Sequence, residues 1–260
     1  MQKILGIDIG ASKIEWTTEE YLKKPNLKTK ILFIDKEISK KALLKIIKKI
    51  INLYPEYKKI GISIAGLVKK EKIDMPNLKK IKNFYPKIGK KGIEIRIEND
   101  AKCAAISQIY KNLRKKKKKI KNFIVICAGS GIGSGIVIDN KLYRGQNNLA
   151  GEIGHQIMNK KEFEELAAGF NIKKDFSKKY KKMAYYFGIG LTNLANLLDV
   201  DIIYIGGSLG KEYLKNKKSK KVILEILKRY CINKKIKIRL CDYKNPSLAG
   251  AILLFENLNI

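Results

Sequence analysis

The chain has 260 residues, of which 45% are hydrophobic and 31% charged, enough to bury one large core or two modest ones. This composition excludes a disordered tail and a small disulfide-stapled domain. The formal net charge is +32, and only five of the 56 basic residues are arginines. Because proteins that read nucleic acid depend on arginine forks and stacked aromatics, we interpret the evenly spread lysines as a solvated surface. Binding of RNA or DNA at low salt stays open.

The four cysteines lie far apart and form no CxxC pair, so neither a disulfide framework nor a zinc knuckle is expected. The chain runs from Met1 directly into a strand pattern, with no signal-peptide core and no apolar stretch of 18 residues. These features predict a cytoplasmic protein that does not enter a membrane.

Short apolar runs alternate with amphipathic segments along the chain. The runs with the length and composition of strands are residues 4–9, 31–34, 60–64, 93–97, 123–127 and 202–205. Apolar residues at helical spacing predict helices at 42–53, 100–113, 182–198 and 213–231. The alternation predicts an α/β fold.

One pattern occurs twice. The first strand breaks at residues 10–12 and resumes at Lys13, and the strand at 123–127 breaks at 129–133, resumes at 135–138 and turns at Asp139-Asn140. Two halves that open with the same glycine-bent hairpin predict two lobes with a cleft between them. The lysine run at 115–119 is then an exposed linker.

The two glycine-rich turns do not match familiar nucleotide motifs. A Rossmann turn needs a helix directly after its glycines, but strand-type residues follow Gly135, and residues 6–13 lack the P-loop spacing. What remains is a turn whose backbone N–H groups can approach an anion with no Cβ in the way. The alternative is a tight hairpin turn without a ligand, which the repetition in both halves disfavours.

Two further segments carry polar residues suited to chemistry. Glu98-Asn99-Asp100 closes an edge strand and opens a helix, where the side chains either cap the helix or supply a general base, Asp100, with Asn99 orienting an alcohol. The only histidine, His155, follows Glu152 between two glycines. The pair could hold sugar hydroxyls, or His155 could be a structural hydrogen-bonding residue.

In this order and spacing, the motifs resemble those of the ROK family of bacterial and archaeal sugar kinases and related repressors. The matching segments are a first phosphate motif at 5–13, an SxPGxV-like segment at 63–68, an ENDA motif at 98–101, a second phosphate motif at 128–135, the family signature at 142–155, a helix and adenosine turn at 188–191 and 205–207, and a closing helix at 248–251. The resemblance implies the actin-like, hexokinase-type (ribonuclease H-like) fold with duplicated mixed sheets flanked by helices. Its lobes would be residues 1–114 with the closing helix 247–260, and residues 120–246.

The resemblance also implies transfer of the γ-phosphoryl group of ATP, with Mg²⁺, to a sugar hydroxyl, with Asp100 as the base. Glucose is the expected sugar, or a related hexose or N-acetylhexosamine. The sugar would be bound by Asp100 together with Gly66, Asn77, Asn99, Glu152, His155 and Glu164. The nucleotide would be bound by Asp8, which would also lie near the metal, and by Gly10, Ala11, Ser12, Lys13, Gly129, Ser130, Gly131, Gly206 and Gly207.

The chain departs from the family at several places. No CxCGxxGC run lies between His155 and Glu164, so zinc is not expected. The segment 169–188 is short, which removes helices that cover the nucleotide or build a dimer face and leaves a homodimer open. Ala11 and Ala65 stand where glycine and proline or glycine are usual.

Two alternatives to the kinase remain from the sequence. A non-catalytic sugar or nucleotide sensor derived from a kinase would bind without turnover, and a polyanion-binding protein would use the lysine surface. The first phosphate motif begins within ten residues of Met1, which leaves no room for the winged helix of ROK repressors. A DNA-binding regulator and a specific nucleic-acid partner are therefore not expected.

Overall fold

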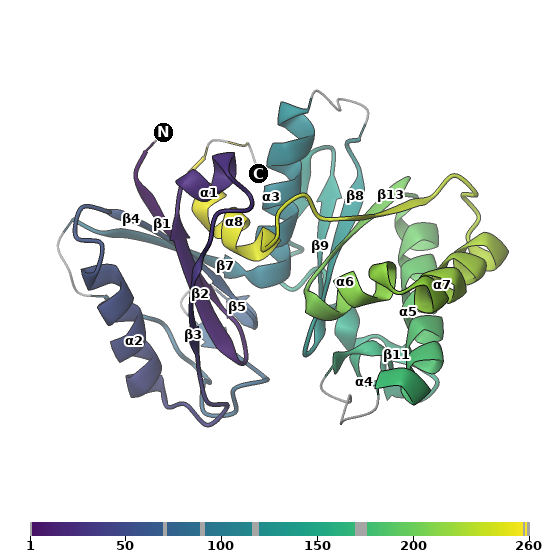
Figure 1. The fold of residues 1–260 in the computed structure, drawn as a ribbon, viewed down its shortest axis with the longest axis horizontal. Coiled ribbons are helices and arrows are strands. Elements are labelled where there is room, and N and C mark those ends of the chain that lie inside the picture. The colour runs from purple at the N-terminus through teal and green to yellow at the C-terminus, as the bar shows by residue number, and fades with distance from the viewer. Residues whose placement is uncertain are drawn as a thin grey trace. The chain divides into compact units, whose positions relative to one another are not determined.

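The computed structural model describes residues 2–69, 72–88, 92–115, 120–169, 176–256 and 258. The chain divides into two compact units, and Figure 1 shows their elements. The first unit consists of Met1–Ser107, Gly145–Leu149 and Asp242–Ile260, and the second of Gln108–Arg144 and Ala150–Cys241. Apart from Lys115, the linker predicted at 115–119 lies outside the described residues. Within these residues no helix is long and apolar enough to cross a membrane.

A five-stranded mixed sheet forms the centre of the first unit. Its strands in spatial order are β3 (Lys30–Phe33), β2 (Lys13–Thr18), β1 (Ile4–Ile9), β4 (Lys59–Ile64) and β7 (Glu94–Asn99). The first three pair antiparallel, whereas β4 and β7 run parallel to β1. The other elements are α1 (Glu20–Lys23), α2 (Lys40–Asn52), the hairpin β5 (Leu67–Lys69) and β6 (Lys72–Asp74), α8 (Pro246–Leu253) and the first part of α3 (Asp100–Arg114).

The second unit repeats this sheet. Its strands in spatial order are β10 (Lys141–Tyr143), β9 (Ile132–Ile138), β8 (Phe123–Ala128), β13 (Ile202–Gly206) and β14 (Lys237–Leu240), with the same directions. The other elements are the 3₁₀ turn η1 (Ile153–His155), β11 (Ile157–Met158), β12 (Lys161–Glu162), α4 (Phe163–Ala167), α5 (Phe176–Leu198), α6 (Ser208–Lys215) and α7 (Lys217–Tyr230). The identical strand order confirms the α/β fold with a duplicated mixed sheet.

Each unit has its own apolar core, because the central strands are buried on both faces. All five residues of β13 are buried, as are five of the six in β1. In the first unit α8 packs on β1 and β4 at very short range. A Cβ on Gly61 would lie 1.9 Å from the Ala251 carbonyl oxygen, and a Cβ on Gly250 1.8 Å from that of Cys103 in α3. Glycine is required at both places because the backbones touch.

One predicted helix is wrong. The segment 213–231 is not a single helix, since α6 ends at Lys215 and α7 begins at Lys217. Asn216 between them is extended, with φ −74° and ψ 119°, and its side chain accepts from the N–H groups of Lys218 and Ser219. A cap at Asn216 therefore starts a new helix where apolar spacing alone continues across the break. The turn predicted at Asp139-Asn140 is confirmed, with positive φ at both residues.

Candidate functional site

In the first unit, the turn between β1 and β2 contains Gly10, Ala11 and Ser12. The Gly10 N–H donates to the Lys13 carbonyl oxygen at 2.9 Å and closes the turn. Ala11 is buried and Ser12 exposed. Lys13, the first residue of β2, places its Nζ 2.5 Å from Oε2 of Glu15, and its side chain stays 41% exposed. The ammonium is therefore held at the side of the turn while remaining open to a ligand from solvent.

Asp8 lies on β1 two residues before this turn. Its Oδ1 accepts from the Ser63 hydroxyl at 2.7 Å and its Oδ2 from the Asn245 amide at 3.0 Å. Burial raises the pKa of Asp8 and outweighs these two donors, which lower it. Each oxygen keeps a second lone pair, so the carboxylate fits the water shell of a magnesium ion, which prefers oxygen ligands.

Glu15 pairs directly with Asp8 across the β1–β2 ladder and is 6% exposed. Burial by itself would raise the pKa of Glu15. The Lys13 ammonium and the Thr29 hydroxyl, 2.5 and 2.7 Å away, outweigh burial and lower that pKa below its ordinary value. Of the two adjacent carboxylates, Glu15 already has a cation, whereas Asp8 is held by neutral donors.

In the second unit, the turn between β8 and β9 contains Gly129, Ser130 and Gly131 and is also three residues long. The Gly129 N–H donates to the Gly131 carbonyl oxygen at 2.9 Å, and the Gly129 carbonyl oxygen accepts from the Gly169 N–H at 2.8 Å. Ser130 is exposed. The sequence-predicted repeat of the opening hairpin is thus present at the same place in both sheets.

Four of the glycines predicted to meet the nucleotide and sugar fall into two groups. A Cβ on Gly207, whose φ is +80°, would lie 2.2 Å from the Ala128 carbonyl oxygen, and a Cβ on Gly66 would lie 2.3 Å from that of Asp74. Chain packing therefore accounts for these two glycines without a ligand. A Cβ on Gly10 would find its nearest atom at 3.4 Å, and one on Gly129 at 4.0 Å. Packing requires no glycine at Gly10 or Gly129, which leaves room there for a bound group.

Asn99 and Asp100 stand at the junction of β7 and α3. Asn99 caps the helix, because its Oδ1 accepts from the Lys102 N–H at 3.1 Å. Its Nδ2 donates to the Gly66 carbonyl oxygen at 3.0 Å and to Oδ1 of Asp100 at 3.2 Å. That Oδ1 also accepts from the Ala101 N–H at 2.9 Å. The capping function thus belongs to Asn99, and the half-buried Asp100 carboxylate is oriented by two donors at the helix N-terminus.

Asn77, predicted to line the sugar pocket, is an exposed turn residue after β6. The hydrogen bonds that join Gly66, Asn99 and Asp100 do not include it. Gly206 ends β13, and Gly207 begins α6 beside it.

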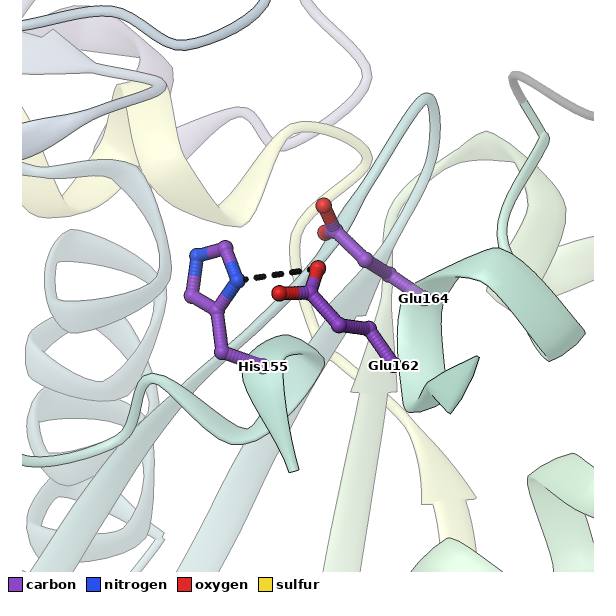
Figure 2. A group of neighbouring side chains, drawn as sticks. All are labelled: His155, Glu162 and Glu164. Atoms are coloured by element: carbon purple, nitrogen blue, oxygen red, sulfur yellow. Dashed lines mark hydrogen bonds and ion pairs between the residues drawn. The ribbon is translucent and has the colours of Figure 1, made fainter. Parts of the chain in front are cut away.

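In the second unit, His155 and Glu164 are brought together with Glu162 (Figure 2). One side-chain N or O atom from each of the three lies within 4.8 Å of the others. His155 Nδ1 is 3.2 Å from Oε2 of Glu162, and both side chains are more than a third exposed. Oε2 of Glu164 accepts from the Ile132 N–H at 3.1 Å, directly after the Gly129–Gly131 turn. Glu152 stands at the start of η1, the turn that ends in His155.

This cluster offers one imidazole and two carboxylates, a donor set that a divalent cation can use. It contains no thiolate. Two of the three residues, His155 and Glu164, are also expected to bind sugar hydroxyls, so a cation and a sugar would compete for them.

Sequence reasoning missed the residues that support the predicted ones. Ser63 and Asn245 hold Asp8, and Glu162 holds His155. Asn245 had a signal, because Asn followed by Pro246 is a typical helix start, and its Oδ1 does cap α8. Ser63 begins the SxPGxV-like segment, but no pattern predicted its bond to Asp8, which strand pairing creates. Glu162 had no signal, since a short hairpin brings it beside His155.

A sequence model described as "ROK family" matches residues 4–170. The chain is 31% identical to a xylose repressor of Caldicellulosiruptor bescii over 174 residues, 60% of this chain and 41% of the repressor. It is 27% identical to an N-acetyl-D-glucosamine kinase of Vibrio atlanticus over 157 residues, 58% of this chain and 51% of the kinase. The matched regions thus span about half the length of these two relatives.

A solved structure of a ROK family glucokinase from Streptomyces griseus, in complex with glucose and AMPPNP, superposes with a TM-score of 0.77 at 20% identity. The match covers 97% of this chain and 98% of the glucokinase. This agreement confirms the expected hexokinase-type fold.

Proposed function

The chain belongs to the ROK family, and from this premise we propose that it is an ATP-dependent sugar kinase. It would transfer the γ-phosphoryl group of Mg-ATP to a hydroxyl of a hexose, with glucose the first candidate, or of an N-acetylhexosamine. Kinases among its relatives support phosphoryl transfer as the reaction class. The S. griseus glucokinase, which has the same fold, was solved with glucose and AMPPNP, which supports a hexose and ATP as the substrate pair.

The observation that carries the proposal is the Asp100 carboxylate at the N-terminus of α3. Asn99 and the Ala101 N–H both hold Oδ1, so the carboxylate is oriented before any substrate binds. In the proposed step Asp100 accepts the proton of the sugar hydroxyl while the hydroxyl oxygen bonds to the γ-phosphorus and the bond to ADP breaks. Because the transition state is loose, orientation of this kind contributes much of the rate.

The phosphate-binding part of the proposal rests on the two equivalent glycine turns. A Cβ could be accommodated at Gly10 and at Gly129, and Lys13 offers a partly exposed ammonium beside the first turn. Backbone N–H groups and a cation are what a polyphosphate requires. Magnesium bound near Asp8 would neutralise charge on the phosphates.

For the sugar, we propose the residues His155, Glu164, Glu152, Asn99 and Asp100. His155 and Glu164 already lie within one cluster. Carboxylate and imidazole groups accept and donate hydrogen bonds with hydroxyls, and a site built on such bonds rejects analogues that lack the hydroxyl. Asn77 and Gly66 remain weaker candidates, because Asn77 is in an exposed turn and packing accounts for Gly66.

A second candidate is a non-catalytic sensor that binds a sugar or nucleotide without turnover. The similarity to the C. bescii xylose repressor favours it, because that relative's name describes regulation and not catalysis.

The two candidates are separated by ADP release from Mg-ATP across hexoses and N-acetylhexosamines, using wild type, Asp100→Asn and Asp139→Asn. The last is a matched control, because Asp139 is an exposed turn residue whose positive φ asparagine tolerates. We expect sugar-dependent release that Asp100→Asn lowers by about 10² to 10⁴, with sugar binding retained. Undiminished turnover in Asp100→Asn would show that Asp100 is not the general base. If the wild type binds a sugar but releases no ADP, the non-catalytic sensor would be established.

A further inference from the structure

Lys102 is a buried lysine next to the proposed base. It lies two residues after Asp100 in the first turn of α3 and is only 1% exposed. Its Nζ donates to the carbonyl oxygen of Asn148 at 2.5 Å. An ammonium taken out of water is unfavourable for folding unless strong partners compensate, and a methionine would fill similar volume without that penalty.

The segment that Lys102 contacts has an unusual place in the chain. Gly145–Leu149 belongs to the first unit, although Arg144 and Ala150 on either side belong to the second. Asn148 adopts a left-handed backbone conformation, with φ 58°, and its Nδ2 donates to the Val68 carbonyl oxygen at 2.7 Å. Two hydrogen bonds, one from α3 and one to β5, thus fix Asn148 in the first unit.

The chain is fixed again three residues later, in the second unit. The Gly151 carbonyl oxygen accepts from both the backbone N–H and the hydroxyl of Ser134, each at 3.0 Å. Only Leu149 and Ala150 lie between the two fixed points, so the Cα atoms of Asn148 and Gly151 can never separate by more than about 11 Å. Glu152, a proposed sugar ligand, comes immediately after Gly151.

We propose that Lys102 is a positioning residue whose ammonium clamps the 145–149 segment to α3. The base Asp100 and the clamp Lys102 share one helical turn, and the clamped segment leads directly into Glu152. Loss of the clamp is therefore expected to weaken sugar binding through Glu152. The inference rests on the proposed kinase function for its catalytic consequence, but not for the clamp itself.

The clamp has a test that does not depend on activity. Lys102→Met removes the ammonium and keeps the volume, and Lys48→Met, at an exposed position of α2, is the matched control for loss of one lysine charge. We expect hydrogen–deuterium exchange of the amides in 145–150 to speed up about tenfold or more in Lys102→Met and to stay unchanged in the control.

Kinetics test the positioning role. With sugar-dependent ADP release as the assay, Lys102→Met should raise the KM for the sugar about tenfold or more and lower kcat, leaving the KM for ATP unchanged. Asn148→Gly keeps the left-handed backbone and the carbonyl but removes the bond to Val68, so it should speed exchange in 145–150 with a smaller change in sugar KM.

The possible outcomes test the proposed kinase function and the Lys102 clamp separately. Wild type without sugar-dependent turnover would refute the kinase function, while the exchange result would still decide the clamp. Unchanged exchange in Lys102→Met would overturn the clamp. Faster exchange with unchanged sugar KM and kcat would overturn the positioning role. Failure of Lys102→Met to fold would show that the lysine is required for stability, which contradicts the inference.

Discussion

Gly129→Ala distinguishes a phosphate-binding turn from a plain hairpin. The φ of Gly129 lies outside the left-handed range, and a Cβ there would have no neighbour closer than the Ser208 hydroxyl at 4.0 Å. The folded protein can therefore accept alanine, and the smaller entropy of the unfolded chain should stabilise the variant by about 0.4–1 kcal/mol. A nucleotide phosphate docked on this turn would meet the new methyl group instead.

The expected effect on the nucleotide follows from the bond that is lost. The Gly129 N–H already donates to the Gly131 carbonyl oxygen, so the bond lost would be one from another N–H of the turn. A hydrogen bond from a backbone N–H to a charged phosphate contributes about 1.5–3 kcal/mol, so the KM for ATP should rise about 10- to 150-fold. The assay is ADP release at saturating sugar across a range of Mg-ATP concentrations, together with thermal unfolding of the same samples. Gly207→Ala is the contrast, because its positive φ and the Ala128 carbonyl oxygen should make it less stable by about 1–3 kcal/mol.

A stable Gly129→Ala protein with an unchanged KM for ATP would refute the reasoning. The open space at Gly129 would then not be used by phosphate, and the turn would be a hairpin connection only.

Two further predictions concern stability. Glu15→Gln should lose about 2 kcal/mol at pH 7, because the pKa of Glu15 lies below its ordinary value of 4.5 and the ionised group, paired with Lys13, stabilises the fold above pH 4.5. That contribution disappears as the pH falls through the folded-state pKa, so urea unfolding at pH 7 and pH 3 should show the gap to wild type closing, and a gap independent of pH would contradict the ion pair. Gly250→Ala should destabilise by at least about 1–3 kcal/mol in thermal unfolding, although alanine normally favours a helix, because its Cβ would lie 1.8 Å from the Cys103 carbonyl oxygen. A neutral result would show that α8 can move away from α3.

Some residues of the candidate site could be recognised from their neighbours in the sequence, whereas others are brought there by contacts between distant segments. Asp100 and Asn99 could be singled out because a strand end followed by a helix start places such residues at a predictable edge, and the structure finds Asn99 capping α3. Glu162 beside His155, by contrast, had no pattern, because the pairing of β11 with β12 brings it there. The partners of Asp8 were missed for a similar reason, since strand pairing and the closing helix bring them from distant parts of the chain.

The alternation of strands and helices, the repeated glycine-bent hairpin and the junction at Asp100 were all predictable from the sequence, because apolar period and turn chemistry depend on neighbouring residues. Packing in three dimensions was needed to show that α6 and α7 are separate and that Lys102 is buried against Asn148. It was also needed to show that close packing requires glycine at Gly66 and Gly207 but not at Gly10 and Gly129. The physical reason is that burial, close backbone approach and hydrogen bonds over 46 residues of chain depend on how elements pack, and no local pattern encodes that packing.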